Sequence, residues 1–270
     1  MCGIAGITTH QSWTPVLQTA LEKLQADLSP RGPDDRGLWL SLSSHAGLCH
    51  TRLAILDLSP AGHQPMADPS GRYHLTFNGE IYNFRELRAV LEATGETFLS
   101  QSDTEVLLRL YAREGKAMLS RLRGMFALAI WDEQQQSLFL ARDPFGIKPL
   151  YYSLRGGVLV FASSVNAIRR CGIVPPELEA RALQPYFETG SVPEPLTLLR
   201  DVFLLEAGHW AVWRNGTMQH GSYWELHFPE NPLTVSEPAA LTRNALLDSL
   251  RTHFISDTPV GLFLSGGIDS

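Results

Sequence analysis

Met1-Cys2-Gly3-Ile4-Ala5-Gly6-Ile7 opens the chain, and the fold depends on this stretch. The apolar run that follows Cys2 is long enough only for a buried strand. A small residue at position 2 permits removal of the initiator methionine, which leaves Cys2 with a free α-amino group. That amine has a reference pKa of about 7.7–8.0, so it can act as general base for the thiol of its own residue. Taken alone, Met-Cys is more often an unreactive, frayed terminus, so the motif needs support from the rest of the chain.

Length and composition limit the classes of protein that the chain can represent. Its 270 residues are 44% hydrophobic and 19% charged, which is enough for a sizeable core without disulfides or metals. At about 150 residues per domain, the length predicts about two domains. The 22 Lys and Arg residues against 28 Asp and Glu give a net charge of −6. With no long basic run, this balance argues against a nucleic-acid or membrane-surface partner.

The apolar runs, the N-terminus and the spacing of cysteine and histidine bear on the location of the protein and on metal binding. The apolar run at 125–131 is far too short to span a bilayer. No basic-then-apolar leader precedes Cys2, so a cytoplasmic location is expected. Cys2, Cys49 and Cys171 have no pair spacing and the histidines show no metal spacing, so no disulfide framework and no metal site are predicted.

Strands and helices come in runs instead of strict alternation, which favours an α+β fold. Thr14-Pro15 predicts a helix start. Asn83 with Glu86, and Ser102 with Glu105, each form a capping box that predicts another. The alternation of Leu38, Leu40 and Leu42 with less apolar neighbours is typical of a half-buried strand. Further strands are predicted at 47–56, 73–77, 126–131, 137–141, 150–154 and 158–162.

The last forty residues have a different pattern. Residues 228–232 carry two prolines, which predicts a linker. A helix is expected at 241–254, followed by a buried strand at 260–264 that runs into Ser265-Gly266-Gly267-Ile268-Asp269-Ser270. A helix, a strand and a glycine loop in this order look like the opening of a second, parallel-sheet domain.

Several motifs in one order resemble a known family. They are Met1-Cys2-Gly3-Ile4-Ala5-Gly6-Ile7, Arg31-Gly32-Pro33-Asp34, His50-Thr51-Arg52-Leu53-Ala54-Ile55, Phe77-Asn78-Gly79-Glu80-Ile81-Tyr82-Asn83, Ser102-Asp103-Thr104-Glu105, Arg142-Asp143-Pro144-Phe145-Gly146-Ile147-Lys148-Pro149-Leu150-Tyr151-Tyr152 and Phe161-Ala162-Ser163. Together they resemble the glutaminase domain of the glutamine-dependent asparagine synthetases, which are N-terminal-nucleophile (class II) amidotransferases. The resemblance implies a four-layer αββα sandwich of antiparallel sheets over residues 1–228. It also implies the truncated start of an α/β ATP-pyrophosphatase-type domain over residues 229–270.

The resemblance implies a role for each residue of a glutamine site. Cys2 is expected to attack the side-chain amide carbon of L-glutamine, while the Asn78 side chain and the Gly79 N–H stabilise the oxyanion. The glutamine-binding residues are expected to be Arg52, Leu53, Ala54, Ile55, Leu56, Asn78, Gly79, Glu80 and Asp103. Within this set Arg52 would hold the α-carboxylate and Asp103 the α-ammonium. Taken alone, Asn78-Gly79 reads more simply as a hairpin turn.

The glycine loop resembles the pyrophosphate-binding loop of adenylating synthetases. Its expected ATP-binding residues are Leu264, Ser265, Gly266, Gly267, Asp269 and Ser270, where small residues let backbone N–H groups approach phosphate. In the family, the longer protein uses ATP and Mg²⁺ to activate aspartate as β-aspartyl-AMP, whereas the glutamine half-reaction needs no cofactor. A homodimer is also expected. Because the sequence stops inside this loop, we expect a truncation that retains glutaminase chemistry alone.

Several alternatives to this interpretation stay open. A paralogue amidating another carboxylate acceptor would share every motif present, and a stand-alone glutaminase fragment would too. An amidotransferase that feeds a sugar-phosphate site is disfavoured by the glycine loop. A non-catalytic glutamine sensor would be expected to lack Cys2 or its oxyanion donors.

Overall fold

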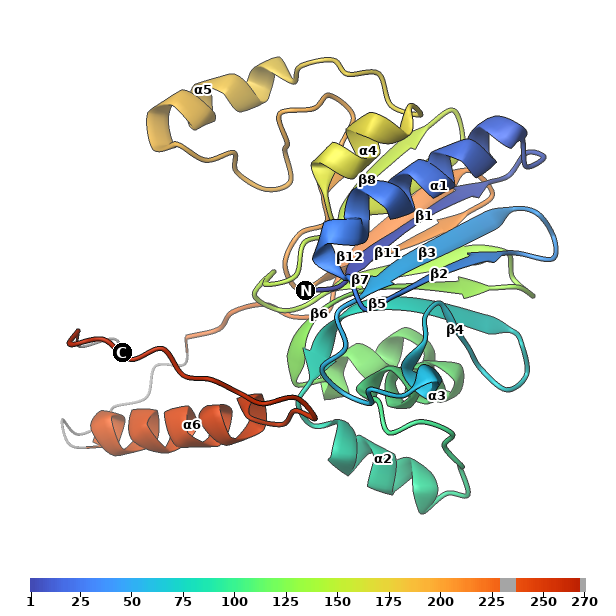
Figure 1. Cartoon of the computed structure of the whole chain (residues 1–270). Coiled ribbons are helices and arrows are strands. Elements are labelled where there is room, and N and C mark those ends of the chain that lie inside the picture. The colour runs from blue at the N-terminus through green and yellow to red at the C-terminus, as the bar shows by residue number, and fades with distance from the viewer. Residues whose placement is uncertain (229–236, 268–270) are drawn as a thin grey trace.

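The computed structural model describes residues 1–228 and 237–267, which form a four-layer sandwich with two helices beside it (Figure 1). In the described residues, two antiparallel six-stranded sheets stack face to face. The first sheet has the order β10 (Phe203–Leu204), β8 (Tyr151–Arg155), β9 (Val158–Ala162), β1 (Gly3–Thr9), β3 (Ala46–Arg52) and β2 (Asp35–Leu40). The second has the order β12 (Thr217–Ser222), β11 (His209–Arg214), β7 (Ser137–Arg142), β6 (Gly124–Asp132), β5 (Tyr73–Ile81) and β4 (Met66–Ala67).

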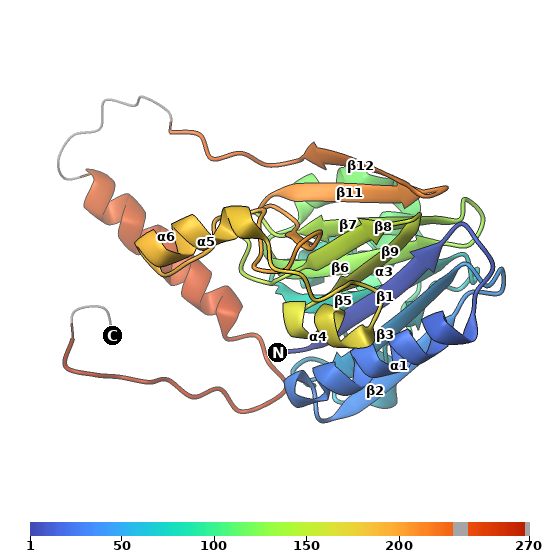
Figure 2. The same cartoon turned by 90° about the horizontal axis from the view of Figure 1, so that it is seen from above.

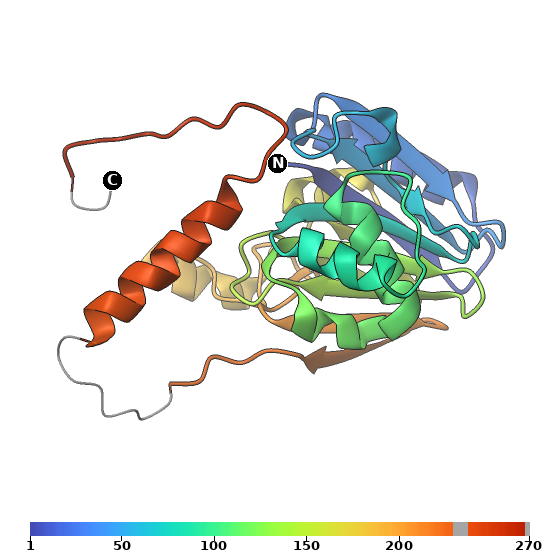
Figure 3. The same cartoon turned by 90° about the horizontal axis from the view of Figure 1, so that it is seen from below.

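Helices cover the outer face of each sheet. Figure 2 shows α1 (Pro15–Leu28) and α4 (Val165–Cys171) over the first sheet, and Figure 3 shows α2 (Phe84–Glu92) and α3 (Asp103–Glu114) over the second. In Figure 1, α5 (Ala180–Thr189) and α6 (Glu237–His253) lie to the side of the sandwich. Short 3₁₀ turns occupy Ser29–Arg31, Pro60–Gly62 and Gly115–Arg121. No helix of the described residues is both long and apolar enough to cross a membrane.

The opening stretch becomes β1, a central strand of the first sheet that is buried on both faces. Successive side chains of a strand point to opposite faces. Ile4 therefore packs into the core between the sheets, while Ala5 and Ile7 pack into the core beneath α1 and α4. The register pairs Gly3 with Thr51 of β3. As a result, Cys2 lies at the strand's end, beside the chain that leaves β3.

Strand β6 has the same double burial in the second sheet. Phe126, Leu128 and Ile130 pack toward α2 and α3, and Ala127 and Ala129 face the core between the sheets. Burying a large apolar side chain contributes about 1.5–3 kcal/mol, so strands with two covered faces dominate the stability of the sandwich. The rigid strands hold the loops that surround Cys2.

The α+β prediction and the αββα sandwich are both confirmed, and several local predictions are confirmed with them. α1 begins at Pro15, with the Thr14 hydroxyl accepting from Leu17 N. The Ser102 hydroxyl caps α3 by accepting from Glu105 N. The Glu105 carboxylate does not complete that capping box, because it accepts from Leu99 N and Ser100 N instead.

The capping box predicted at Asn83 is wrong. No capping hydrogen bond comes from the Asn83 side chain at the start of α2. Its amide instead donates to Arg121 O at 2.9 Å and accepts from Arg123 N at 3.0 Å. The asparagine therefore joins α2 to the segment that precedes β6, a long-range use that no local pattern reveals.

The half-buried strand predicted around Leu38 is present as β2. Its two leucines face solvent and its tryptophan faces the core, which is the reverse of what the alternation predicts. Leu38 is 38% exposed and Leu40 is 41% exposed, while Trp39 packs on the core between the sheets. The tryptophan also stacks on His74, with ring centroids 3.9 Å apart. Its larger apolar surface outweighs two leucines in setting the face of an edge strand.

The buried strand predicted at 260–264 is wrong for this structure. Val260 is 50% exposed and Phe263 fully exposed, and no strand pairing includes either residue in the part of the chain described. A buried parallel strand needs at least one neighbouring strand and covered faces, and the described residues supply neither at 260–264. The linker predicted at 228–232 falls, beyond Phe228, outside the described residues, as do Ile268, Asp269 and Ser270.

Candidate active site

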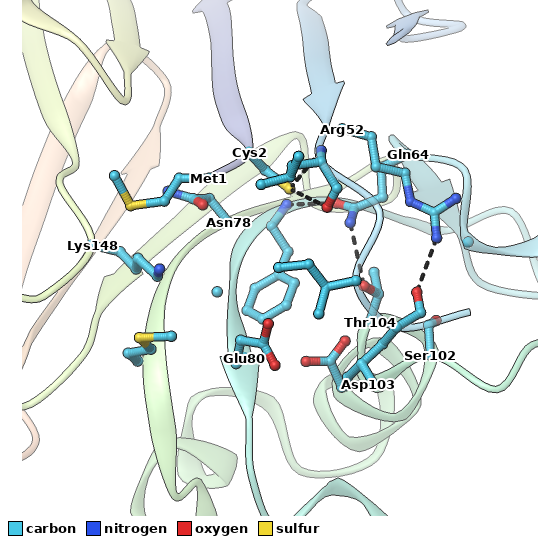
Figure 4. Close-up of a pocket in the computed structure, with 17 residues that line it drawn as sticks. Met1, Cys2, Arg52, Gln64, Asn78, Glu80, Ser102, Asp103, Thr104 and Lys148 are labelled. Atoms are coloured by element: carbon cyan, nitrogen blue, oxygen red, sulfur yellow. Dashed lines mark hydrogen bonds between the residues drawn. The ribbon is translucent and has the colours of Figure 1, made fainter. Parts of the chain in front are cut away.

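A cavity of about 260 Å³ opens where β1 begins and β3 ends, beside residues 77–80 of β5 (Figure 4). Its wall contains most of the residues predicted for the glutamine site: Cys2, Arg52, Leu53, Ile55, Leu56, Asn78, Gly79, Glu80 and Asp103. The lining residues that sequence reasoning missed are Met1, Gly62, Gln64, Phe77, Ser102, Thr104, Met125 and Lys148. Ala54 is the predicted residue that does not line it, since it faces a neighbouring hollow and donates its N–H to Asp34 at 2.8 Å.

Cys2 is held at its sulfur and at its carbonyl oxygen. Leu53 N lies 3.4 Å from the Cys2 sulfur and donates to it, and Arg31 Nε donates to Cys2 O at 3.0 Å. Burial raises the pKa of the Cys2 thiol, and the Leu53 N–H opposes that effect. The thiol is therefore largely protonated at neutral pH unless a base lies next to it. Arg31 belongs to the matched 31–34 segment, whose turn chemistry hid this role.

Asn78 lies inside β5 and not in a hairpin turn, opposite Ala127 of β6. The residue is 1% exposed, and its Nδ2 has no hydrogen-bond partner among the described residues. A buried amide donor without a partner is destabilising by about 1–3 kcal/mol. The cost is removed when an acceptor enters the cavity beside Cys2.

Gly79 offers a second donor beside Asn78. Its partner Phe126 bonds through both N and O to Asp143, at 3.1 and 2.8 Å, so the Phe126 polar groups point away from β5. In an antiparallel pair, the Gly79 N–H then also points outward, to the open edge of β5. On that edge, Phe77 N donates to Gln64 Oε1 and Ile81 N donates to Asp103 Oδ2. No acceptor for Gly79 N–H lies between them in the described residues.

Glycine is required at position 79 by the neighbouring strand β6. A Cβ at Gly79 would lie 2.3 Å from Met125 O and 2.8 Å from the Phe126 Cα. The close approach is thus to the backbone of β6 and not to the cavity. Glycine lets the two strands pack while the N–H stays on the open edge.

The Arg52 guanidinium is 7% exposed and holds the neighbouring loop. It donates to Ser59 O at 3.1 Å, to Leu56 O at 3.1 Å and to Asp57 O at 2.5 Å. Three of its five donors are therefore bonded, and two remain for a carboxylate. The arginine shapes the loop whose residues Ile55 and Leu56 line the cavity.

Glu80 and Asp103 face the cavity from β5 and from the first turn of α3 (Figure 4). Burial raises the pKa of Asp103 to about 6, with the Ile81 N–H opposing this. Burial and the nearby Asp103 raise the pKa of Glu80 to about 7. In the part of the chain that the structure describes, no cation bonds to either carboxyl, and two desolvated carboxyls of this kind favour a cationic ligand group.

Gln64 and Thr104 connect the two sides of the cavity. The Gln64 amide accepts from Phe77 N at 2.7 Å and donates to the Thr104 hydroxyl at 3.2 Å. Gln64 lies in no motif used above, whereas Ser102 and Thr104 flank Asp103 within a matched motif. That adjacency is a signal that could have identified the latter two.

The described part of the predicted ATP loop, residues 264–267, is exposed to solvent. Leu264 is 72% exposed, a Cβ at Gly266 would meet nothing within 4 Å, and Gly267 N donates to the Ser265 hydroxyl. No group of three or more His, Cys, Asp or Glu side chains placed to hold a metal occurs in residues 1–228 and 237–267. Binding of ATP and Mg²⁺ by this loop therefore stays a prediction, since Ile268, Asp269 and Ser270 lie outside the described residues.

The two stacked antiparallel sheets between helical layers, with Cys2 at the end of a central strand, define the N-terminal-nucleophile hydrolase class of fold. Sequence comparison then identifies the family. The glutamine amidotransferase domain matches residues 1–224, so the chain belongs to the glutamine amidotransferase family. The asparagine synthase family matches residues 241–270.

Similar proteins agree with this family. Asparagine synthetase [glutamine-hydrolyzing] 1 of Bacillus subtilis is 40% identical over all of this chain and 43% of its own length. Amidase chry2 of Gibberella zeae is 37% identical over all of this chain and 42% of its own length. The chain thus spans less than half the length of these relatives.

A solved structure supports the fold. Glutamine phosphoribosylpyrophosphate amidotransferase from B. subtilis, complexed with ADP and GMP, aligns with a TM-score of 0.61 and 23% identity. The alignment covers 83% of this chain and 49% of that one. At this identity the likeness concerns the arrangement of sheets and helices alone.

Proposed function

We propose that the chain hydrolyses L-glutamine to L-glutamate and ammonia, with Cys2 as the nucleophile after Met1 has been removed. The observation that carries the proposal is the buried Asn78 Nδ2, which has no partner in the described residues and lies in the same cavity as Cys2. A stable protein keeps such a donor unpaired at a functional site, where a ligand oxygen can accept from it.

The reaction begins with proton transfer from the Cys2 thiol to its own α-amine. The thiolate attacks the amide carbon of glutamine, and the carbonyl oxygen becomes an oxyanion within reach of Asn78 Nδ2 and Gly79 N–H. When the C–N bond breaks, the α-ammonium returns its proton to the leaving nitrogen, and ammonia departs from a glutamyl thioester. Water, activated by the same amine, then attacks the thioester and releases glutamate and the thiol.

The ends of free glutamine match the charges of the cavity. Glu80 and Asp103 are proposed to accept from the α-ammonium, whose positive charge would lower both raised pKa values and keep the two carboxyls ionised. The remaining donors of Arg52 are proposed to hold the α-carboxylate. Leu53, Ala54, Ile55 and Leu56 complete the proposed site, with Ala54 acting through its backbone bond to Asp34.

The test is conversion of glutamine to glutamate by the purified chain, preceded by mass spectrometry that identifies the first residue. We expect Cys2 as the N-terminal residue and loss of turnover in Cys2→Ala. Cys171→Ala is the matched control, because Cys171 is buried under α1 and is expected to leave turnover unchanged. Retained Met1 with full activity, or unchanged turnover in Cys2→Ala, would contradict the mechanism.

For the longer protein we propose a glutamine-dependent asparagine synthetase, with residues 1–228 as the glutaminase domain and 229–270 as the linker and first part of the synthetase domain. Its activity would use ATP and Mg²⁺ to amidate aspartate with ammonia from the first domain. The match of residues 241–270 to the asparagine synthase family supports this proposal. A homodimeric state and a cytoplasmic location stay predictions.

A related protein that amidates another carboxylate is the second candidate. The similarity to Amidase chry2, at 37% identity, favours keeping it. Incubating the longer protein with glutamine, Mg·ATP and aspartate separates the two candidates. Asparagine formation supports the synthetase, whereas glutamine hydrolysis without asparagine favours another acceptor.

A further inference from the structure

Lys148 is a buried lysine in the cavity wall, and the proposed reaction assigns no role to it. Its side chain lines the same wall as Cys2 and Glu80 and points inward below Met1 (Figure 4). The residue is 6% exposed. Its Nζ makes no hydrogen bond and no ion pair within 4 Å to any part of the chain that the structure describes. Burial lowers the pKa of Lys148, and the negative charges of Glu80 and Asp143 oppose that effect and favour the ammonium.

The backbone of Lys148 is fixed at both of its polar groups. Lys148 N donates to Asp143 Oδ2 at 3.0 Å, and Lys148 O accepts from Arg142 Nε at 2.9 Å. The Asp143 carboxylate also accepts from Phe126 N, Phe145 N and Ile147 N. This gives the matched 142–152 segment a purpose, because its turns place one lysine side chain at a defined point in the cavity wall.

Most other charged groups around Cys2 and Lys148 are already bonded to the backbone. These groups are Arg31, Asp34, Arg52, Glu80, Asp103 and Asp143. Arg31 bonds to Cys2 O, Asp34 to Ala54 N, and Arg52 to the carbonyls of its loop. Glu80 and Asp103 are carboxyls that stay partly protonated near neutral pH because of their burial.

We propose that Lys148 is a positioning residue for the nucleophile, which keeps the N-terminal cysteine free of an extra proton at neutral pH. The proposal rests on the proposed role of Cys2 in glutamine hydrolysis. The reactive form of the residue is neutral overall, whether its proton is on sulfur or on nitrogen. Adding one more proton gives a cation, which the Lys148 ammonium repels in either case. The lysine therefore lowers the pH at which the nucleophile is switched off.

The experiment compares Lys148→Met with the parent chain after mass spectrometry has shown that Met1 is removed from both. Two pH profiles are measured: kcat/KM for glutamine, and the rate of Cys2 alkylation by iodoacetamide. We expect the acid limb of both profiles to move up by about one pH unit, which is roughly a tenfold loss at pH 6 and little loss above pH 8.5. Cys49 and Cys171 are buried and stay unreactive in the folded chain.

Two further variants keep the result decisive. Lys148→Arg retains the charge and is expected to keep the parent acid limb, and Lys23→Met removes an exposed lysine from α1 without effect. If Lys148→Met does not fold, Lys148→Gln takes its place. Unchanged acid limbs in the neutral variants, or an equal loss at every pH, would overturn the proposal. The alkylation profile stays readable even if glutamine is not the substrate, so the two proposals can fail separately.

Discussion

At the residue scale, the cavity unites side chains that the sequence places far apart. Cys2, Asn78, Gly79 and Asp103 were predictable because each lies in a motif, and the structure puts all of them in one wall. Gln64 lies outside every motif, and Lys148 lies inside the matched 142–152 segment without a predicted role, because a sequence does not show that one amide or one ammonium is buried beside Cys2. The motifs predicted that Arg52 holds the α-carboxylate, but they did not show that three of its donors bond to the 56–59 loop. The hydrogen-bond partners of Arg52 and the burial of Gln64 and Lys148 depend on tertiary packing, which the sequence does not show.

Replacing Asn78 by Ala tests the oxyanion donor. The amide has no partner in the described residues, so its loss should not weaken the folded protein and should act on the transition state. We expect kcat for glutamine hydrolysis to fall by about 10²–10³ while KM changes little. Steady-state kinetics together with thermal unfolding measures both effects. A large fall in Tm at unchanged kcat would contradict the assignment.

Replacing Asp103 by Asn separates binding from stability. Burial raises the Asp103 pKa to about 6, above the ordinary value of 3.8, so the folded state holds the proton more tightly than the unfolded state. Stability from this group is present below about pH 4 and is lost as the pH rises to 6. At pH 7.5 we therefore expect Asp103→Asn to stabilise the unliganded chain by roughly 1–3 kcal/mol.

The same substitution should harm glutamine binding. The neutral amide cannot pair with the α-ammonium, so KM is expected to rise at least tenfold at pH 7.5. For the parent chain, KM should rise as the pH falls through 7 and 6, where Glu80 and Asp103 take up protons. Denaturant unfolding and a KM profile check the two effects. A destabilised Asp103→Asn with an unchanged KM would contradict both.

At the element scale, periodicity located the main elements and tertiary contacts decided their details. The helix at Pro15 and the hairpin through Gly156 and Gly157 follow from local propensity and turn chemistry. The face of β2 was not given by hydropathy, because Trp39 prevails over the leucines. The strand expected at 260–264 needs a sheet to join. The apolar run that predicted this strand does not show whether a sheet is present beside it.

Asn83 provides the test at this scale. Its amide bonds to Arg121 O and Arg123 N, so Asn83→Ala should release the segment that leads into β6 and destabilise the chain by about 1–3 kcal/mol. Ser102→Ala is the comparison variant, since it removes a true helix cap and should cost about 1 kcal/mol. Urea unfolding gives both values. Full stability in Asn83→Ala would show that the two bonds contribute nothing in solution.

At the scale of the whole molecule, the order of the expected elements predicted an α+β fold and the resemblance of the motifs implied the layered sandwich, but neither showed how the region after it contacts the cavity. The chain beyond α6 returns to the 55–59 loop beside the cavity: Asp257 N donates to Ile55 O at 3.0 Å, and Asp57 N donates to Asp257 Oδ2 at 2.8 Å. His253 lies on the Tyr82 ring, with centroids 4.1 Å apart. Residues 200 positions apart thus meet at one loop, a contact that sequence patterns cannot reveal.

This contact joins the region matched to asparagine synthase with the loop that lines the cavity at Ile55 and Leu56. Asp57 lies in the left-handed region at φ +52°, a conformation that the bond from its N–H to Asp257 helps to hold. We therefore expect Asp257→Ala to loosen the loop and raise KM for glutamine about 3- to 10-fold, the scale of one hydrogen bond. The Tm should change little, because Asp257 is exposed and outside the core.

Asp248→Ala is the matched control for Asp257→Ala. Asp248 pairs with Arg123 at 2.7 Å on the exposed surface of α6, away from the cavity loop. Exposed ion pairs contribute about 0–1 kcal/mol, so this variant should keep the parent KM. Steady-state kinetics with glutamine in all three chains distinguishes the outcomes. An equal KM in the two variants would mean that the contact of Asp257 with the 55–59 loop does not affect the glutamine site. A rise in KM in Asp257→Ala alone would show that the region after residue 240 acts on the cavity through residue 257.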